Sequence, residues 1–157
     1  MEAARKTSLV GFVTGTIAGL AAITPASGFV GPVGAMIIGG VAGIICYLMV
    51  HLIKRRLKID DSLDVFAVHG IGGLVGTLLV AILAFPSFGG LGLAAGMTAG
   101  SQLGVQALGS VAVAAWAVVG SVIIIGIVCA ITPLRVSDDD ETEGLDVTVH
   151  GERGYNL

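Results

Sequence analysis

Charged residues of this 157-residue chain are confined to a few short stretches, and this distribution limits the folds that the chain can adopt. Only 12% of the residues are charged, whereas 55% are hydrophobic, and the mean hydropathy is +0.98. Long uncharged segments lie between the charged stretches, and about 20 apolar residues are enough to cross a bilayer as a helix. Composition and pattern therefore predict an integral membrane protein and not an ordinary soluble domain.

Four of the uncharged segments are expected to be transmembrane helices, which predicts an all-α, polytopic membrane helix bundle. The expected helices lie near residues 9–23, 33–52, 65–85 and 97–131. The last segment would be roughly 50 Å long as a helix, so we expect it to tilt and to extend beyond the bilayer. Residues 1–134 are predicted to form the transmembrane region, and residues 135–157 are predicted to form a cytoplasmic tail.

Lysine and arginine residues predict the orientation of these helices. If the four helices alternate in direction, all eight basic residues fall on one side of the membrane, and the loops at 24–32 and 86–96 on the other side carry no charge. Because basic loops favour the cytoplasm, both termini are predicted to be cytoplasmic. The cell membrane is the expected location, and no cleavable signal peptide is recognised before the first span.

The 25 glycines predict close packing between the helices. Many recur at four-residue spacing, as in Gly39 and Gly43, and small residues at this spacing allow helix backbones to approach one another. General tolerance of glycine in membrane helices is the simpler explanation for any single pair. Repetition in all four segments favours a tight bundle.

His69 is the main candidate for a functional residue because it stands within an otherwise uncharged span. A polar ring in a membrane helix is unfavourable unless it faces protein or water, so such a residue marks a candidate site. The spacing of Val65, Gly72, Gly73 and Gly76 predicts that they share the helical side of His69, which makes that side narrow. The ring is expected to point into a pore or a protein interior, and the structural alternative is a hydrogen bond between helices.

Asp61 and Asp64 lie towards the expected cytoplasmic end of the same span. Backbone N–H groups and the positive end of the helix dipole favour an anion at a helix start. We therefore expect both carboxylates to serve the start of the His69 helix.

The sequence gives no indication of an enzyme. The spans contain no nucleophile with a base, no paired carboxylates and no ligand cluster, so we predict neither a metal nor another cofactor. The net charge of −3 offers no support for nucleic-acid binding.

The segment DDSLDVFAVHGIGGLVGTLL, residues 60–79, resembles the signature of the penultimate helix in the Amt/Mep/Rh ammonium transporter family. Residues 8–48 resemble the two preceding helices of that family, and residues 134–155 resemble its cytoplasmic tail. The resemblance implies the C-terminal portion of the family fold, about helices 8 to 11 and the tail. It also implies part of an eleven-helix bundle that assembles as a trimer with one pore in each subunit.

The resemblance also implies roles for individual residues. His69 is similar in position to the second of two histidines in the pore of the family, and Val65 to an apolar residue that lines the pore. Gly72, Gly73 and Gly76 are expected to pack beside the pore. Six tail residues resemble the part that packs on the cytoplasmic face, couples neighbouring subunits and helps to bind PII-type signalling proteins, namely Gly144, Leu145, Asp146, His150, Gly151 and Glu152.

The function implied by the resemblance is transport of ammonium or ammonia through a histidine-lined pore in the lipid bilayer. A dry conduit must pass neutral ammonia or move the proton separately, and imidazoles can hydrogen-bond ammonia and relay a proton. Family helices before about the eighth have no counterpart, so we expect a truncated product, an internal start or one piece of a split transporter. The alternative is a non-conducting membrane module that joins transporter trimers or binds a PII-type protein.

Overall fold

The computed structural model describes residues 9–155, and its regular elements within these residues are all helical. Four of the described helices are long and apolar enough to cross a membrane, which confirms the all-α class and the expected set of apolar helices. The chain divides into two units, one ending at Ala112 and one beginning at Val113. Each unit is described by itself.

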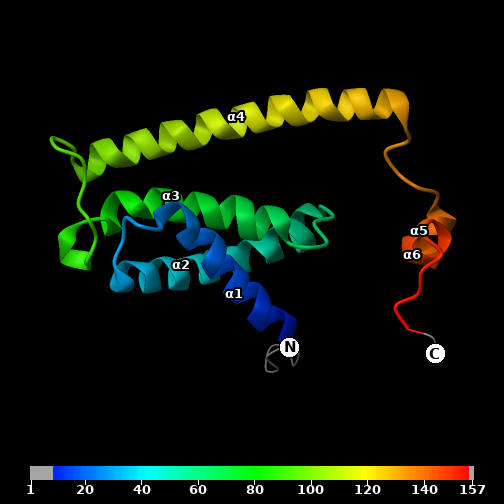
Figure 1. Cartoon of the computed structure of the whole chain (residues 1–157), viewed down its shortest axis with the longest axis horizontal. Helices are drawn as coiled ribbons and strands as arrows, with labels where there is room; N and C mark the ends of the chain where they lie inside the picture. Colours follow the sequence, from blue (N-terminus) through cyan, green and yellow to red (C-terminus); the bar gives the residue numbers. More distant parts are fainter. Residues whose placement is uncertain (1–8, 156–157) are drawn as a thin grey trace. The chain divides into compact units, whose positions relative to one another are not determined.

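Three apolar helices make up most of the first unit and lie side by side (Figure 1). They are α1, Leu9–Ile23; α2, Pro32–His51; and α3, Gly72–Leu83. Two π-helical segments adjoin them, η3, Leu52–Leu57, after α2, and η4, Phe66–Ile71, before α3. Two 3₁₀ turns follow α1 and α3, namely η2, Thr24–Ala26, and η5, Pro86–Phe88. The fourth apolar helix, α4, Ala99–Ile131, begins in the first unit and continues in the second.

Proline and glycine determine where these helices begin and end. Pro32 occupies the first position of α2, where its missing N–H is no loss and its fixed φ suits a helix. Phe85 precedes Pro86 and is extended, with φ −66° and ψ 147°, as residues before proline prefer. Gly89 then adopts a φ of 77°, which glycine reaches without strain. Both loops therefore form where the sequence predicts helix breaks.

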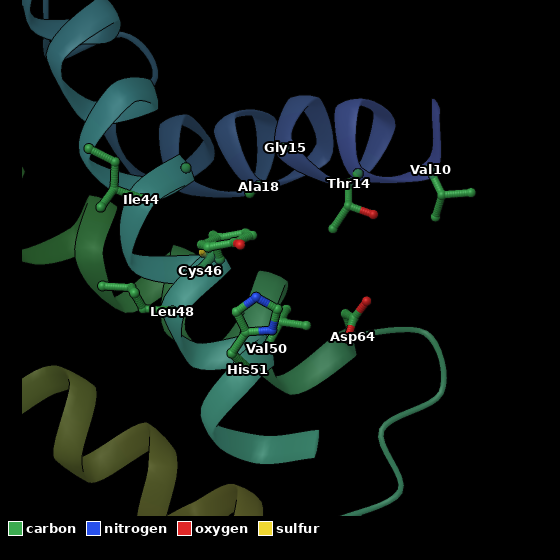
Figure 2. A pocket seen from close by; sticks show the side chains of 13 residues that line it. Val10, Thr14, Gly15, Ala18, Ile44, Cys46, Leu48, Val50, His51 and Asp64 are labelled. Atoms are coloured by element: carbon green, nitrogen blue, oxygen red, sulfur yellow. The ribbon is translucent and has the colours of Figure 1, made fainter. Parts of the chain in front are cut away.

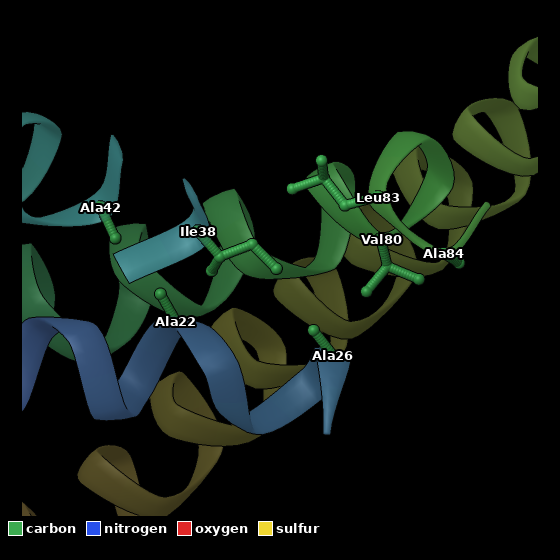
Figure 3. Packing of buried hydrophobic residues seen from close by; sticks show 7 residues of the cluster. All are labelled: Ala22, Ala26, Ile38, Ala42, Val80, Leu83 and Ala84. Carbon is green, nitrogen blue, oxygen red and sulfur yellow. The ribbon is translucent and has the colours of Figure 1, made fainter. Parts of the chain in front are cut away.

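A core of small residues holds α1, α2 and α3 together (Figure 3). Seven buried residues form it, Ala22, Ala26, Ile38, Ala42, Val80, Leu83 and Ala84. Ile38 is fully buried, whereas the four alanines bring the helix backbones close together. In a membrane such association depends on van der Waals packing, because lipid tails are as apolar as the side chains. Small residues therefore favour this packing more than bulky ones would.

The two uncharged loops of the first unit meet each other. The Leu91 N–H donates a hydrogen bond to the Phe29 carbonyl oxygen at 3.1 Å. A Cβ atom added to Gly31 would overlap the backbone of Gly89, so this approach requires glycine. The loop before α2 is thereby joined to the loop after α3.

The second unit contains the rest of α4 and two short helices, α5, Asp138–Glu143, and α6, Leu145–Thr148. The Ser137 Oγ atom accepts a hydrogen bond from the Asp140 N–H at 3.1 Å and caps α5. An exposed ion pair joins Arg135 Nη2 to Glu141 Oε2 at 2.7 Å. The acidic run of the tail therefore forms a capped helical turn.

Candidate functional site

His69 lies in the π-helical segment η4, within the apolar span Phe66–Leu83. Such π-helical turns are rare and often occur at functional sites. The imidazole is exposed, and its side chain has no hydrogen bond or ion pair with any residue in the range 9–155. Contact of a bare imidazole with lipid is unfavourable, so the site is suited to face water, a solute or another protein surface.

The residues expected to share the side of His69 differ in burial. Val65 is 52% exposed, Gly73 is half-buried with open space at its Cβ position, and both Gly72 and Gly76 are buried. This difference in burial arises from the π-helical segment η4. A π-helix holds more residues per turn than an α-helix, so the residues that follow His69 are rotated relative to it. The roles of these residues beside a pore stay predictions.

Gly72 and Gly76 bring α3 into close contact with its neighbours. A Cβ atom on Gly76 would collide with the carbonyl group of Ala22 in α1. A Cβ atom on Gly72 would lie 3.3 Å from Cys46 Sγ in α2, tighter than most contacts of this kind. These glycines therefore hold the helical span that carries His69 against α1 and α2.

Two aspartates precede η4 and make different contacts. The Asp61 carboxylate accepts hydrogen bonds from the Val65 N–H at 2.8 Å and the Phe66 N–H at 3.0 Å, so it caps the helix as expected. Asp64 Oδ1 instead lies 2.7 Å from Lys54 Nζ, in an ion pair without hydrogen-bond geometry. The expectation for Asp64 is wrong because Asp61 already takes the free N–H groups, which leaves Asp64 to join η3 to the start of η4.

Replacing Asp61 by alanine is expected to loosen the start of the His69 helix. Loss of an N-cap costs about 0.5–2 kcal/mol of stability, so the Tm in detergent micelles should fall. Asp60→Ala is the matched control, because the Asp60 carboxylate accepts a hydrogen bond from the Ser62 hydroxyl at 2.8 Å and does not cap the helix. Equal Tm shifts for the two variants would contradict the capping role.

A cavity of ≈ 560 Å³ lies between α1 and α2, and no motif indicated it (Figure 2). Glycines such as Gly15 and Gly43 line it, so the spacing that predicts close packing here leaves space instead. The polar side chains of Thr14, His51 and Asp64 gather towards one end of it. Within residues 9–155, no three histidine, cysteine, aspartate or glutamate side chains gather as a metal site requires.

The tail residues expected to act together are close in the second unit. Gly144 has a φ of 101° and precedes α6. The His150 N–H donates to the Leu145 carbonyl oxygen at 3.3 Å, and the Glu152 N–H donates to the Asp146 carbonyl oxygen at 2.8 Å. Main-chain hydrogen bonds therefore bring the two halves of the predicted tail motif together.

A protein-family model described as the Ammonium Transporter Family matches residues 1–155. The chain belongs to the ammonium transporter family. The ammonium transporter of Aquifex aeolicus is 41% identical to it over 153 residues, and ammonium transporter Amt1 of Archaeoglobus fulgidus is 48% identical over 152 residues. These alignments cover 97% and 96% of the chain, but 36% and 38% of the two relatives.

The fold of this chain matches part of a solved structure called Sensor Amt Protein. Its TM-score is 0.82 at 36% sequence identity, over 92% of the chain and 35% of that protein. The chain therefore spans about a third of the length of the relatives that it matches. The predicted family and fold are confirmed, and the relatives are named as transporters and not as enzymes.

Proposed function

We propose that this chain takes part in moving ammonium or ammonia across the membrane, with His69 and Val65 lining the conduit. One observation carries the proposal: His69 is an exposed imidazole in an apolar span, in a chain whose relatives are named ammonium transporters. Val65, one turn before it, is also exposed.

The chemistry of ammonia suits this pair of side chains. An ammonium ion that enters a dry apolar conduit loses its hydration, which is strongly unfavourable, whereas neutral ammonia loses much less. A neutral imidazole offers one donor and one acceptor, so His69 can replace hydrogen bonds that ammonia leaves behind in water. Val65 keeps the adjoining wall apolar. The supported function is therefore passage of ammonia, with the proton carried separately or left behind.

The exposed side of His69 requires further protein to close such a conduit. Gly72 and Gly76 are packed against α1 and α2, whereas the imidazole is exposed within the described residues. We propose that helices beyond the described residues complete the wall, and that the complete assembly is a trimer with one pore in each subunit.

The proposal places both chain ends in the cytoplasm and the helices in the cell membrane. The segment 54–58, between α2 and η4, carries four basic residues, whereas the loops at the other ends of these helices are uncharged. Basic loops are retained in the cytoplasm. In this orientation the tail residues around α6 are available to neighbouring subunits and to a PII-type signalling protein, which we propose as partners.

Ammonium-dependent current and internal alkalinisation in proteoliposomes test the proposed function. The chain is reconstituted alone and together with a seven-helix ammonium transporter fragment, and protein-free liposomes and sodium in place of ammonium serve as controls. We expect transport only with the second fragment, because the described helices leave His69 exposed. Silence in both preparations, with insertion verified by protease protection, would contradict the transport function. Activity of the chain alone would contradict the need for further helices.

A further inference from the structure

We propose that Lys54 is a positioning residue for His69. Its ammonium group holds the far end of the loop at 58–64, and this end sets the start of the π-helical segment in which His69 lies. Lys54 therefore acts through Asp64 and not on the transported solute. The inference rests on the proposed function, because it concerns the side chain proposed to meet ammonia.

The loop between η3 and η4 turns sharply at both of its ends. Lys58 and Asp64 have φ values of 53° and 57°, a left-handed conformation that is uncommon for residues other than glycine. At the first end, the Ile59 N–H donates a hydrogen bond to the Ile53 carbonyl oxygen at 3.1 Å. The second end, at Asp64, lies where the loop meets the helix that carries His69 (Figure 2). Both conformations therefore depend on contacts that the folded chain supplies.

Lys54 reaches back from η3 and makes two contacts with this second end. Its Nζ atom lies 2.7 Å from Asp64 Oδ1 and donates a hydrogen bond to the Ser62 carbonyl oxygen at 3.3 Å. The Asp64 side chain is only 18% exposed, and its Oδ1 atom has no hydrogen-bond partner within the described residues. A largely buried carboxylate that loses its cation is left with an uncompensated charge, which is strongly unfavourable. The charge of Lys54 therefore holds Asp64 in its place.

The main chain carries this restraint from Asp64 to His69. The Asp64 carbonyl oxygen accepts a hydrogen bond from the Val68 N–H at 2.8 Å, and Val68, which is 2% exposed, directly precedes His69. Because π-helical turns are rare in proteins, we expect η4 to depend on contacts from outside the segment. Without Lys54 this segment is free to relax towards an α-helix, which would turn the imidazole relative to the packed part of the span.

Hydrogen–deuterium exchange of the full chain in micelles tests the restraint without reference to transport. In Lys54→Met we expect the backbone amides of residues 65–71 to exchange roughly tenfold faster, as loss of one hydrogen bond from a charged donor would give. Arg55→Met is the matched control. It removes the same charge from the next residue, whose side chain has no hydrogen bond or ion pair with any residue in the range 9–155, and should leave this exchange unchanged. Equal exchange in the two variants would overturn the proposal.

Transport by the complete assembly tests whether the restraint acts through His69. We expect Lys54→Met to lower ammonium-dependent flux roughly tenfold and Lys54→Arg, which keeps a cation at this position, to restore most of it. In a His69→Ala background, Lys54→Met should cause no further loss, because the side chain that Lys54 positions is absent. General damage to the fold would instead lower flux in both backgrounds.

The two kinds of failure are distinguishable in these experiments. An additive loss in the His69→Ala background, with the unmodified assembly active, would overturn the role of Lys54 and leave the transport function standing. Silence of the unmodified assembly would overturn the transport function and with it any role of Lys54 in transport.

Discussion

Replacing His69 by alanine in the complete assembly is expected to lower ammonium-dependent transport roughly ten- to a hundredfold. Ammonia that passes the site would lose a hydrogen-bonding partner in an apolar conduit, and an unmade hydrogen bond of this kind costs about 1–3 kcal/mol in the barrier. The imidazole is exposed and holds no other residue in the described range, so its loss should leave folding and assembly intact. Flux in proteoliposomes and subunit assembly in micelles measure the two effects.

Two further variants identify what His69 contributes. His69→Gln keeps a donor and an acceptor but cannot carry a proton near neutral pH. If the imidazole relays protons, His69→Gln should retain internal alkalinisation by ammonia while losing ammonium-dependent current. Ile82→Ala is the matched control, because Ile82 lies in α3 of the same apolar span and is 47% exposed. Unchanged transport in His69→Ala would contradict the pore assignment, as would an equal loss in Ile82→Ala.

The sequence predicts the membrane fold well because its main determinants are local. Segment length and absence of charge predict four apolar helices, and the structure contains them. Pro32 and Pro86 locate helix boundaries because proline restricts its own backbone and that of the preceding residue. The contact between the loops at Gly31 and Gly89 joins residues far apart in sequence, so no local pattern indicates it.

The candidate site is predicted less completely because its geometry depends on departures from the regular α-helix. An expected spacing of 3.6 residues per turn places Gly76 on the side of His69. The π-helical segment η4 changes that relation, and Gly76 is buried whereas His69 is exposed. Similarly, Asp61 and Asp64 have the same sequence signal for helix capping, and only their three-dimensional neighbours distinguish them.

The cavity between α1 and α2 was also beyond prediction from the sequence. Glycines spaced four residues apart favour helix contact, and Gly76 fulfils that expectation. Gly15 and Gly43 have open space around their Cβ positions and line a cavity instead. The same residue type therefore produces contact or space according to the distance between helix axes, which is a tertiary property.

Gly76→Ala is expected to lower the stability of the helix bundle by about 1–3 kcal/mol, the usual effect of overpacking. Alanine is a better helix former than glycine by about 1 kcal/mol, so without a steric conflict the substitution would stabilise α3. The added Cβ atom collides with the backbone carbonyl group of Ala22, which cannot rotate away as a side chain could. Either α1 must move away from α3, or α3 must shift along it. Thermal unfolding in micelles measures the loss.

The matched control for this effect is Gly73→Ala, three residues earlier on the same helix, where no atom lies within 4 Å of the Cβ position. It should leave stability unchanged or raise it, so the two substitutions are expected to differ in sign. Maleimide labelling of Cys46, which is 2% exposed, reports the opening of the helix contacts, in a background where the exposed Cys129 is replaced by serine. We expect rapid labelling only in Gly76→Ala. If both variants melt alike and Cys46 stays unreactive in both, α1 and α3 do not approach as closely at Gly76 as the structure places them, and His69 is not held in position by this contact.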